Sequence, residues 1–161
     1  MSIPTPSAGF LHIVVGYDGS PPASRALDGA VRLLQGRTGR LEVVYVAHLT
    51  STVMLSADAI AEMETDFDEI EKDLRVQAAQ QLGDRVDWGF QRRQGLITEQ
   101  LIEVASGLVE AGAASGSGSG SGSDETVVIV VGSSSHAAHR MVGSVAVNLA
   151  RHSPVPLVIV P

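Results

Sequence analysis

Two glycine-containing segments, residues 16–20 and 132–144, could bind a phosphorylated ligand. Each begins directly after a β-branched apolar run and leads into a segment with helical spacing, so each should connect a strand to a helix. Free backbone N–H groups at a helix N-terminus favour an anion such as phosphate. In the first segment, Asp18 offers a short carboxylate for a ribose hydroxyl or a ring N–H. Two tight connections without a ligand would show the same pattern, so the residues alone leave both interpretations open.

Other side chains that could do chemistry lack the partners that the chemistry requires. His136 and His139 have the spacing of a metal pair, but no third ligand follows at a matching distance, so we expect polar loop residues. The serines at 133–135 do not form the Gly-x-Ser-x-Gly pattern of a hydrolase. The chain has no cysteine, which excludes a thiol nucleophile, a disulfide and a Cys-ligated zinc or iron–sulfur site. No catalytic residue is therefore predicted, and we expect a protein that is not an enzyme.

Two further patterns favour structural roles. An acidic run from Asp58 to Asp73 lacks the glycine and the spacing of a calcium loop. It is typical of a solvated helix face, with a surface for docking a partner as the alternative. Trp88 and Phe90 alternate on one face of a predicted strand, where we expect packing rather than a stacking platform.

Composition and charge exclude several kinds of partner. The chain has 161 residues with 18 Asp and Glu against 11 Lys and Arg, which gives a net charge of −7. Such an acidic chain is not expected to bind nucleic acid or an anionic membrane. No apolar run is long enough to span a bilayer, and residues 1–9 resemble a flexible tail rather than a signal peptide. We therefore expect a cytoplasmic protein.

Short apolar runs typical of strands alternate along the chain with segments whose apolar residues have helical spacing, and this alternation predicts an α/β fold. Strands are predicted at residues 11–15, 41–47, 86–91, 126–131 and 156–160, and helices at residues 21–35, 56–82, 98–109 and 144–150. The second helix carries an apolar face from Ile60 to Ala78. Alternation of apolar strands with helices predicts a parallel, doubly wound sheet in one domain, residues 10–161. A Ser-Gly low-complexity loop is expected at residues 114–123.

The sequence resembles the universal stress protein (UspA) family, in an actinobacterial type, from residue 11 to residue 161. The resemblance is carried by Ile-Val-Val-Gly-Tyr-Asp-Gly-Ser at 13–20, Tyr-Val-Ala-His at 45–48, Val-Val-Gly-Ser at 130–133, Gly-Ser-Val at 143–145 and Pro-Val-Pro-Leu-Val-Ile-Val-Pro at 154–161. It implies a five-stranded flavodoxin/Rossmann-like sheet of order 3-2-1-4-5. It also implies a stress-response regulator that forms a homodimer through the C-terminal strand. One branch of the family binds ATP, which Mg²⁺ can accompany, and any hydrolysis here would be very slow.

The resemblance also assigns roles to residues of this chain. Asp18 would meet the adenosine end of the nucleotide, and Val46 would hydrogen-bond adenine through its backbone. Residues at the second glycine segment would line the phosphates. The implied site comprises Gly16, Tyr17, Asp18, Val46, Gly132, Ser133, Ser135, Arg140, Gly143, Ser144 and Val145.

The second glycine segment departs from the family's ATP-binding pattern in two ways. Ser135 stands where the pattern has its second glycine, and the segment is two residues shorter. A Cβ at this position hinders close backbone approach, and the shorter loop loses N–H donors. Arg140, a good phosphate partner, lies in the same segment. The alternative is a dimeric interaction protein of the same fold whose phosphate loop no longer binds a nucleotide.

Overall fold

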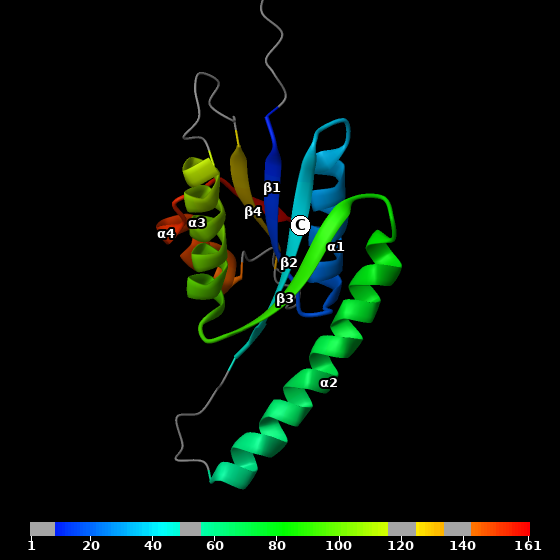
Figure 1. Cartoon of the computed structure of the whole chain (residues 1–161), viewed down its shortest axis with the longest axis vertical. Coiled ribbons are helices and arrows are strands. Elements are labelled where there is room, and N and C mark those ends of the chain that lie inside the picture. The colour runs from blue at the N-terminus through cyan, green and yellow to red at the C-terminus, as the bar shows by residue number, and fades with distance from the viewer. Residues whose placement is uncertain (1–8, 49–55, 116–124, 134–142) are drawn as a thin grey trace, which may run out of the picture.

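The fold is an open, parallel β-sheet with helices on both faces, and Figure 1 shows its two helical layers. The computed structural model describes residues 9–48, 56–115, 125–133 and 143–161. The five strands have the order β3-β2-β1-β4-β5, which confirms the expected flavodoxin/Rossmann-like sheet. The elements are β1 (Leu11–Gly16), α1 (Pro21–Leu34), β2 (Gly39–Ala47), α2 (Ala57–Leu82), β3 (Asp87–Gln94), α3 (Ile97–Ser115), β4 (Thr126–Gly132), α4 (Ser144–His152) and β5 (Leu157–Val160).

The ends of α1 follow from residues that the sequence shows. Ser20 is the N-cap, and its Oγ accepts a hydrogen bond from the backbone N–H of Ala23 at 3.4 Å. Pro21 and Pro22 occupy the first helical positions, where a missing N–H costs nothing. Gly36, with a φ of 73°, lies just beyond the C-cap. The helix therefore begins immediately after the turn that follows β1.

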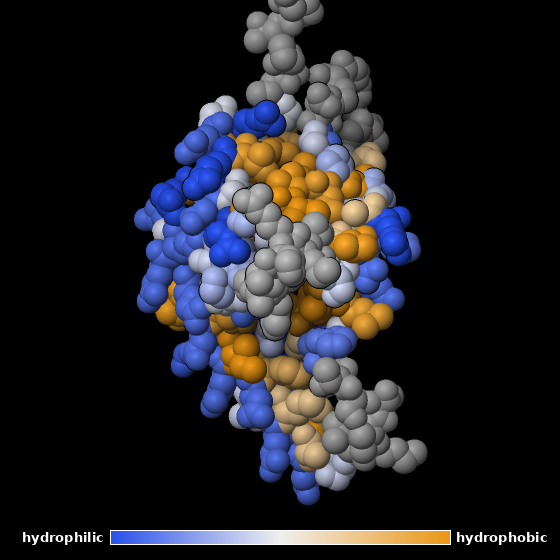
Figure 2. All heavy atoms as spheres, turned by 180° about the vertical axis from the view of Figure 1, so that it is seen from behind, coloured by the Kyte–Doolittle hydropathy of each residue, from blue (hydrophilic) through white to orange (hydrophobic). Residues whose placement is uncertain are grey.

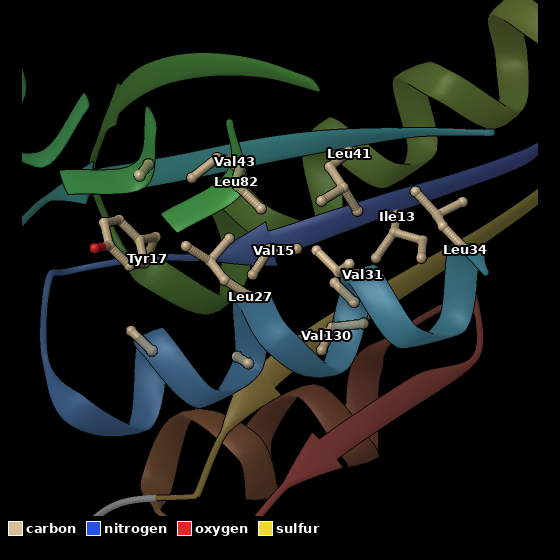
Figure 3. Close-up of a cluster of buried hydrophobic side chains, with 14 of the residues drawn as sticks. Ile13, Val15, Tyr17, Leu27, Val31, Leu34, Leu41, Val43, Leu82 and Val130 are labelled. Atoms are coloured by element: carbon tan, nitrogen blue, oxygen red, sulfur yellow. The ribbon is translucent and has the colours of Figure 1, made fainter. Parts of the chain in front are cut away.

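Each face of the sheet has its own hydrophobic core. On one face α1 and α2 cover a cluster that includes Ile13, Val15 and Leu27 (Figure 3). On the other face α3 and α4 cover a cluster that includes Val14 and Ile129. Successive strand residues point to opposite faces, so the central strands β1 and β4 are buried on both sides. This burial explains why their sequences are nearly continuous apolar runs.

The predicted limits differ most from the structure at the C-terminal ends of α3 and β3. α3 continues to Ser115, whereas the predicted helix ends at residue 109, because the intervening alanines favour helix strongly. The low-complexity loop expected at 114–123 therefore does not include its first two residues, and the rest of it lies outside the described residues. β3 extends to Gln94, which pairs with Ala47 of β2. The tail predicted at 1–9 also lies outside the described residues, apart from its last position.

The residues of α2 that are buried in a hydrophobic core of the described residues lie in its C-terminal part. Leu74, Ala78 and Leu82 are buried in the core that α1 shares. Ile60 and Ile70, on the apolar face predicted for this helix, remain 48% and 42% exposed. Figure 1 shows the N-terminal half of α2 running past the end of the sheet. Neither α2 nor any other helix of the described residues is long and apolar enough to cross a membrane.

Candidate nucleotide-binding site

A cleft of about 310 Å³ opens at the carboxyl ends of β1 and β4. The chain leaves β1 toward α1 on one face and leaves β4 toward α4 on the other, so the cleft lies where the connections diverge. Ligands of open α/β sheets bind at such a switch point. The volume is at the lower end of the range for small-molecule sites.

The cleft brings together most of the residues that the sequence singles out. Nine of them line it, and their role in binding stays a prediction: Gly16, Tyr17, Asp18, Val46, Gly132, Ser133, Gly143, Ser144 and Val145. Ser135 and Arg140 lie outside the described residues, as do His136 and His139. Sequence reasoning missed Ile97 and Leu101 of α3, which add an apolar wall.

The turn after β1 presents Asp18 at the cleft. The backbone N–H of Ser20 donates to Asp18 Oδ1 at 3.0 Å, and Gly19 has a φ of 76°. The backbone N–H of Tyr17 donates to the carbonyl of Val44 at 2.9 Å, which ties the turn to β2. Asp18 is exposed, and among the described residues Oδ2 has no hydrogen-bond partner. This oxygen can accept a hydrogen bond from a ligand hydroxyl or N–H.

Gly132 ends β4 where α1 begins. A Cβ at this position would lie 2.3 Å from the carbonyl oxygen of Pro22 and 2.4 Å from its carbonyl carbon. Ser133 follows, and its backbone N–H donates to the carbonyl of Val160 at 2.7 Å. Only glycine allows the strand end and the helix start to come so close.

The first turn of α4 also lines the cleft. Gly143 is its N-cap in extended conformation, with no side-chain hydrogen bond to the first turn. Ser144 and Val145 follow and line the cleft. The first N–H groups of a helix have no partner within the helix and carry a partial positive charge. They can therefore bind an anionic group of a ligand in the cleft.

The walls of the cleft are mostly apolar and carry little charge. Among the described residues that line it, Asp18 has the only charged side chain. Burial raises the pKa of the Tyr17 hydroxyl, and the nearby Asp18 carboxylate raises it further, so Tyr17 is neutral at neutral pH. No group of three or more metal-ligating side chains occurs in the described parts of the chain. Binding in this cleft would therefore depend on backbone donors, Asp18 and apolar contact.

Comparisons with known proteins agree with this architecture. The model of the universal stress protein family matches residues 9–108. The structure is similar to UspA from Lactobacillus plantarum, at 17% identity and a TM-score of 0.72, over 96% of this chain and 100% of that one. A search of curated protein sequences gave no match.

Two similar structures hold an adenine nucleotide. One is a universal stress protein in complex with cAMP, at 24% identity and a TM-score of 0.60, over 96% of this chain and 99% of that one. The other is a universal stress protein family member from Arabidopsis thaliana with AMP bound, at 10% identity and a TM-score of 0.59, over 93% and 90%. Since the family model covers more than half of its length, this chain belongs to the universal stress protein family.

Proposed function

We propose that the protein binds an adenine nucleotide in the cleft and acts as a cytoplasmic stress-response regulator rather than as an enzyme. The observation that supports this most is that Asp18 and the first turn of α4 line the same cleft. One offers a carboxylate for the ribose, and the other offers free N–H groups for a phosphate. The neighbours with cAMP and AMP bound support the class of ligand.

In the proposed complex, each part of the cleft meets a different part of the nucleotide. The base lies against Val46, Ile97 and Leu101, and the Val46 backbone hydrogen-bonds adenine. Gly132, together with the first turn of α4, surrounds the phosphates, and Gly16 and Tyr17 complete the wall. ATP is the largest candidate, with Arg140 and Ser135 as further phosphate contacts. Because Asp18 is the one carboxylate among the described lining residues, Mg²⁺ would be held chiefly by the phosphates.

Replacing Ser144 with proline tests the phosphate contact directly. Proline is tolerated at the first position of a helix, and Gly143 has the extended ψ of 158° that a residue before proline prefers. Ser144→Pro therefore removes one backbone N–H while it keeps α4 intact. AMP binding, measured by titration calorimetry, should weaken about tenfold or more, because a hydrogen bond to a charged group is lost. Ser144→Ala keeps the N–H and should weaken binding only a few-fold.

Adenosine serves as the ligand without a phosphate. The affinity for adenosine should be equal in the Ser144→Pro and Ser144→Ala variants. If Ser144→Pro weakened the binding of adenosine as much as that of AMP, Ser144 would not contact the phosphate. Asp18→Asn, compared with the exposed Asp84→Asn outside the cleft, tests the ribose contact. Titrations with AMP, cAMP and ATP, with and without Mg²⁺, identify the preferred phosphate chain. An absence of heat with all three at millimolar concentration would refute nucleotide binding.

The second candidate is a dimeric interaction protein without a nucleotide, and homodimerisation through β5 is proposed for both. The backbone N–H groups of Ile129 and Ser133 donate to Pro156 and Val160, so alternate residues of β5 pair with β4. The N–H of Ile159 belongs to the other set and faces the free edge. Ile159→Pro should therefore give a monomer in sedimentation, whereas Ile159→Val should stay dimeric. A monomeric wild type at tens of micromolar would refute this interface.

A further inference from the structure

The N-terminal half of α2 carries an apolar stripe that is partly or largely exposed in the part of the chain that the structure describes. The stripe consists of Ile60, Met63, Phe67 and Ile70, and none of these belongs to either hydrophobic core of the described residues. Its spacing of three and four residues continues to Leu74, which is buried. In Figure 2 the lower part of the molecule, which α2 forms, shows apolar residues bordered on one side by hydrophilic ones. The stripe is therefore an exposed continuation of the apolar face by which α2 packs on the sheet.

Ion pairs hold this half of α2 in place. Arg92 of β3 lies 2.7 Å from Asp68 (Nη1–Oδ1), 3.3 Å from Glu64 (Nη2–Oε2) and 3.6 Å from Glu71 (Nε–Oε2). Gln94 Nε2 donates a further hydrogen bond to Glu64 at 2.9 Å. The pKa of the Arg92 guanidinium is raised, chiefly by its hydrogen bond to Asp68. These contacts fix one flank of the stripe against β3, so the stripe is presented by an anchored helix.

The opposite flank of the stripe is acidic and unpaired. At 100° per residue, Asp66 and Asp73 lie next to the stripe, and Glu62 and Glu69 lie just beyond them. All four are exposed, and none takes part in an ion pair within the described residues. The stripe is thus bordered by carboxylates on both sides, those at 64 and 71 bound to Arg92 and the others free.

These charges decide which kind of helix can cover the stripe. A second copy of α2 would have the right apolar spacing, which is that of a two-stranded coiled coil. Its flanking positions, however, carry Glu64, Asp66, Glu71 and Asp73, so two copies would place like charges beside each other. A helix with the same apolar spacing and with Lys or Arg on its flanks has complementary charge. We propose that the α2 stripe binds a basic amphipathic helix of another protein.

The test uses a synthetic helical peptide of three heptads with leucine in the seam and lysine or arginine at the flanking positions. Its binding to the full chain is measured by fluorescence anisotropy of a dye-labelled peptide. Phe67→Gln should weaken binding about tenfold or more, since aromatic residues at the centre of an interface contribute most. Val76→Gln is the matched control, because Val76 is 49% exposed on the opposite face of α2 and should leave binding unchanged. Both changed residues are partly or largely exposed, so both variants should fold.

Charge is tested separately. Asp66→Asn with Asp73→Asn should weaken binding and reduce its dependence on salt, and a peptide with glutamate at the flanking positions should not bind. Equal binding of the two peptides would overturn the proposal, as would an equal effect of Phe67→Gln and Val76→Gln, or no binding of the basic peptide at 100 µM. Sedimentation of the Phe67→Gln variant detects the competing occupant. If the wild type were a dimer and Phe67→Gln by itself made it a monomer, the stripe would be an interface between copies, and the proposal would be wrong.

Discussion

Gly19 and Leu74 are in such close contact that a Cβ on Gly19 would lie 2.6 Å from Leu74 Cδ2. Gly19 belongs to the turn that presents Asp18, and Leu74 is the first fully packed residue after the exposed stripe of α2. The turn of the candidate nucleotide site therefore rests on the point at which α2 enters the core. A change in the packing of α2 at Leu74 would therefore displace this turn directly.

Gly19→Ala should destabilise the protein by about 2–3 kcal/mol, because it combines a left-handed backbone conformation with overlap on Leu74. Gly36→Ala is the control. Gly36 has almost the same φ, 73° against 76°, but no atom of the described residues lies within 4 Å of its Cβ position. It should cost only about 1 kcal/mol. Urea unfolding of both variants measures the difference, and equal losses would show that Leu74 moves aside without cost.

Gly132→Ala should cost at least about 3 kcal/mol, because the new Cβ would overlap backbone atoms of Pro22, which cannot move like a flexible side chain. Gly107→Ala provides the opposite expectation. Gly107 lies within α3, and none of the residues that the structure describes comes within 4 Å of its Cβ position, so alanine should stabilise the protein by about 0.5–1 kcal/mol. The melting temperature should thus fall in Gly132→Ala and rise in Gly107→Ala. A Gly132→Ala variant as stable as the wild type would contradict the contact with Pro22.

Stability should fall at high pH through the two tyrosines of the chain. Burial raises the pKa of Tyr17 above 10.0, and Asp18 adds to the effect. Burial also raises the pKa of Tyr45, with Arg92 lowering it and Asp18 raising it. Since both folded pKa values exceed those of the unfolded chain, the stabilisation is present below about pH 10 and is lost as pH rises through the folded values.

This prediction is checked by measuring the free energy of unfolding between about pH 9 and about pH 11, where it should decline. Tyr17→Phe should flatten the decline, because the buried ring is kept and the ionising group is removed. In Tyr45→Phe, Tyr17 is the last tyrosine, so the tyrosinate absorbance reports Tyr17 alone. Its midpoint should lie above 10.0, and a midpoint at or below that value would contradict the burial of its hydroxyl.

Arg92→Gln should lower the melting temperature by about 2–4 °C, because three carboxylates of α2 lose their shared partner. Arg75 is the comparison. The Arg75 side chain is exposed, and its Nη2 lies 2.7 Å from Glu71 Oε1. Its Cζ lies 5.0 Å from the centroid of the Phe90 ring. Arg75→Gln should cost only about 1 °C. Raising the salt concentration in the thermal unfolding experiment should reduce the difference between the melting temperatures of the two variants. An equal fall in melting temperature for both variants at low salt would refute a special role for Arg92.

Much of the fold could be predicted because its strands are buried on both faces. β1 and β4 are therefore continuous apolar runs whose alternation with helices allows few topologies. Local chemistry also gave the start of α1, since Ser20 caps it and prolines follow. The exposure of Ile60 and Ile70 could not be predicted, because an apolar period shows which face of a helix is apolar and not how far the sheet beneath it extends.

The candidate site was predictable where it consists of strand ends and helix starts. Asp18, Gly132 and Gly143 lie beside recognisable strand-to-helix connections, and the sheet order brings these connections together. Ile97 and Leu101 gave no such signal. They are ordinary apolar residues of α3, and they reach the cleft only because this helix crosses from β3 to pack beside β1 and β4.

The contact between Gly132 and Pro22 has a consequence for how such chains change during evolution. Glycine is required there by the distance between a strand and a helix, with or without a ligand in the cleft. A lineage that ceased to use nucleotide would keep this glycine under selection for folding alone. A loop motif can therefore outlast the activity for which it is used as a marker. Drift would become visible first at positions such as Ser144, which is exposed and free of that packing constraint.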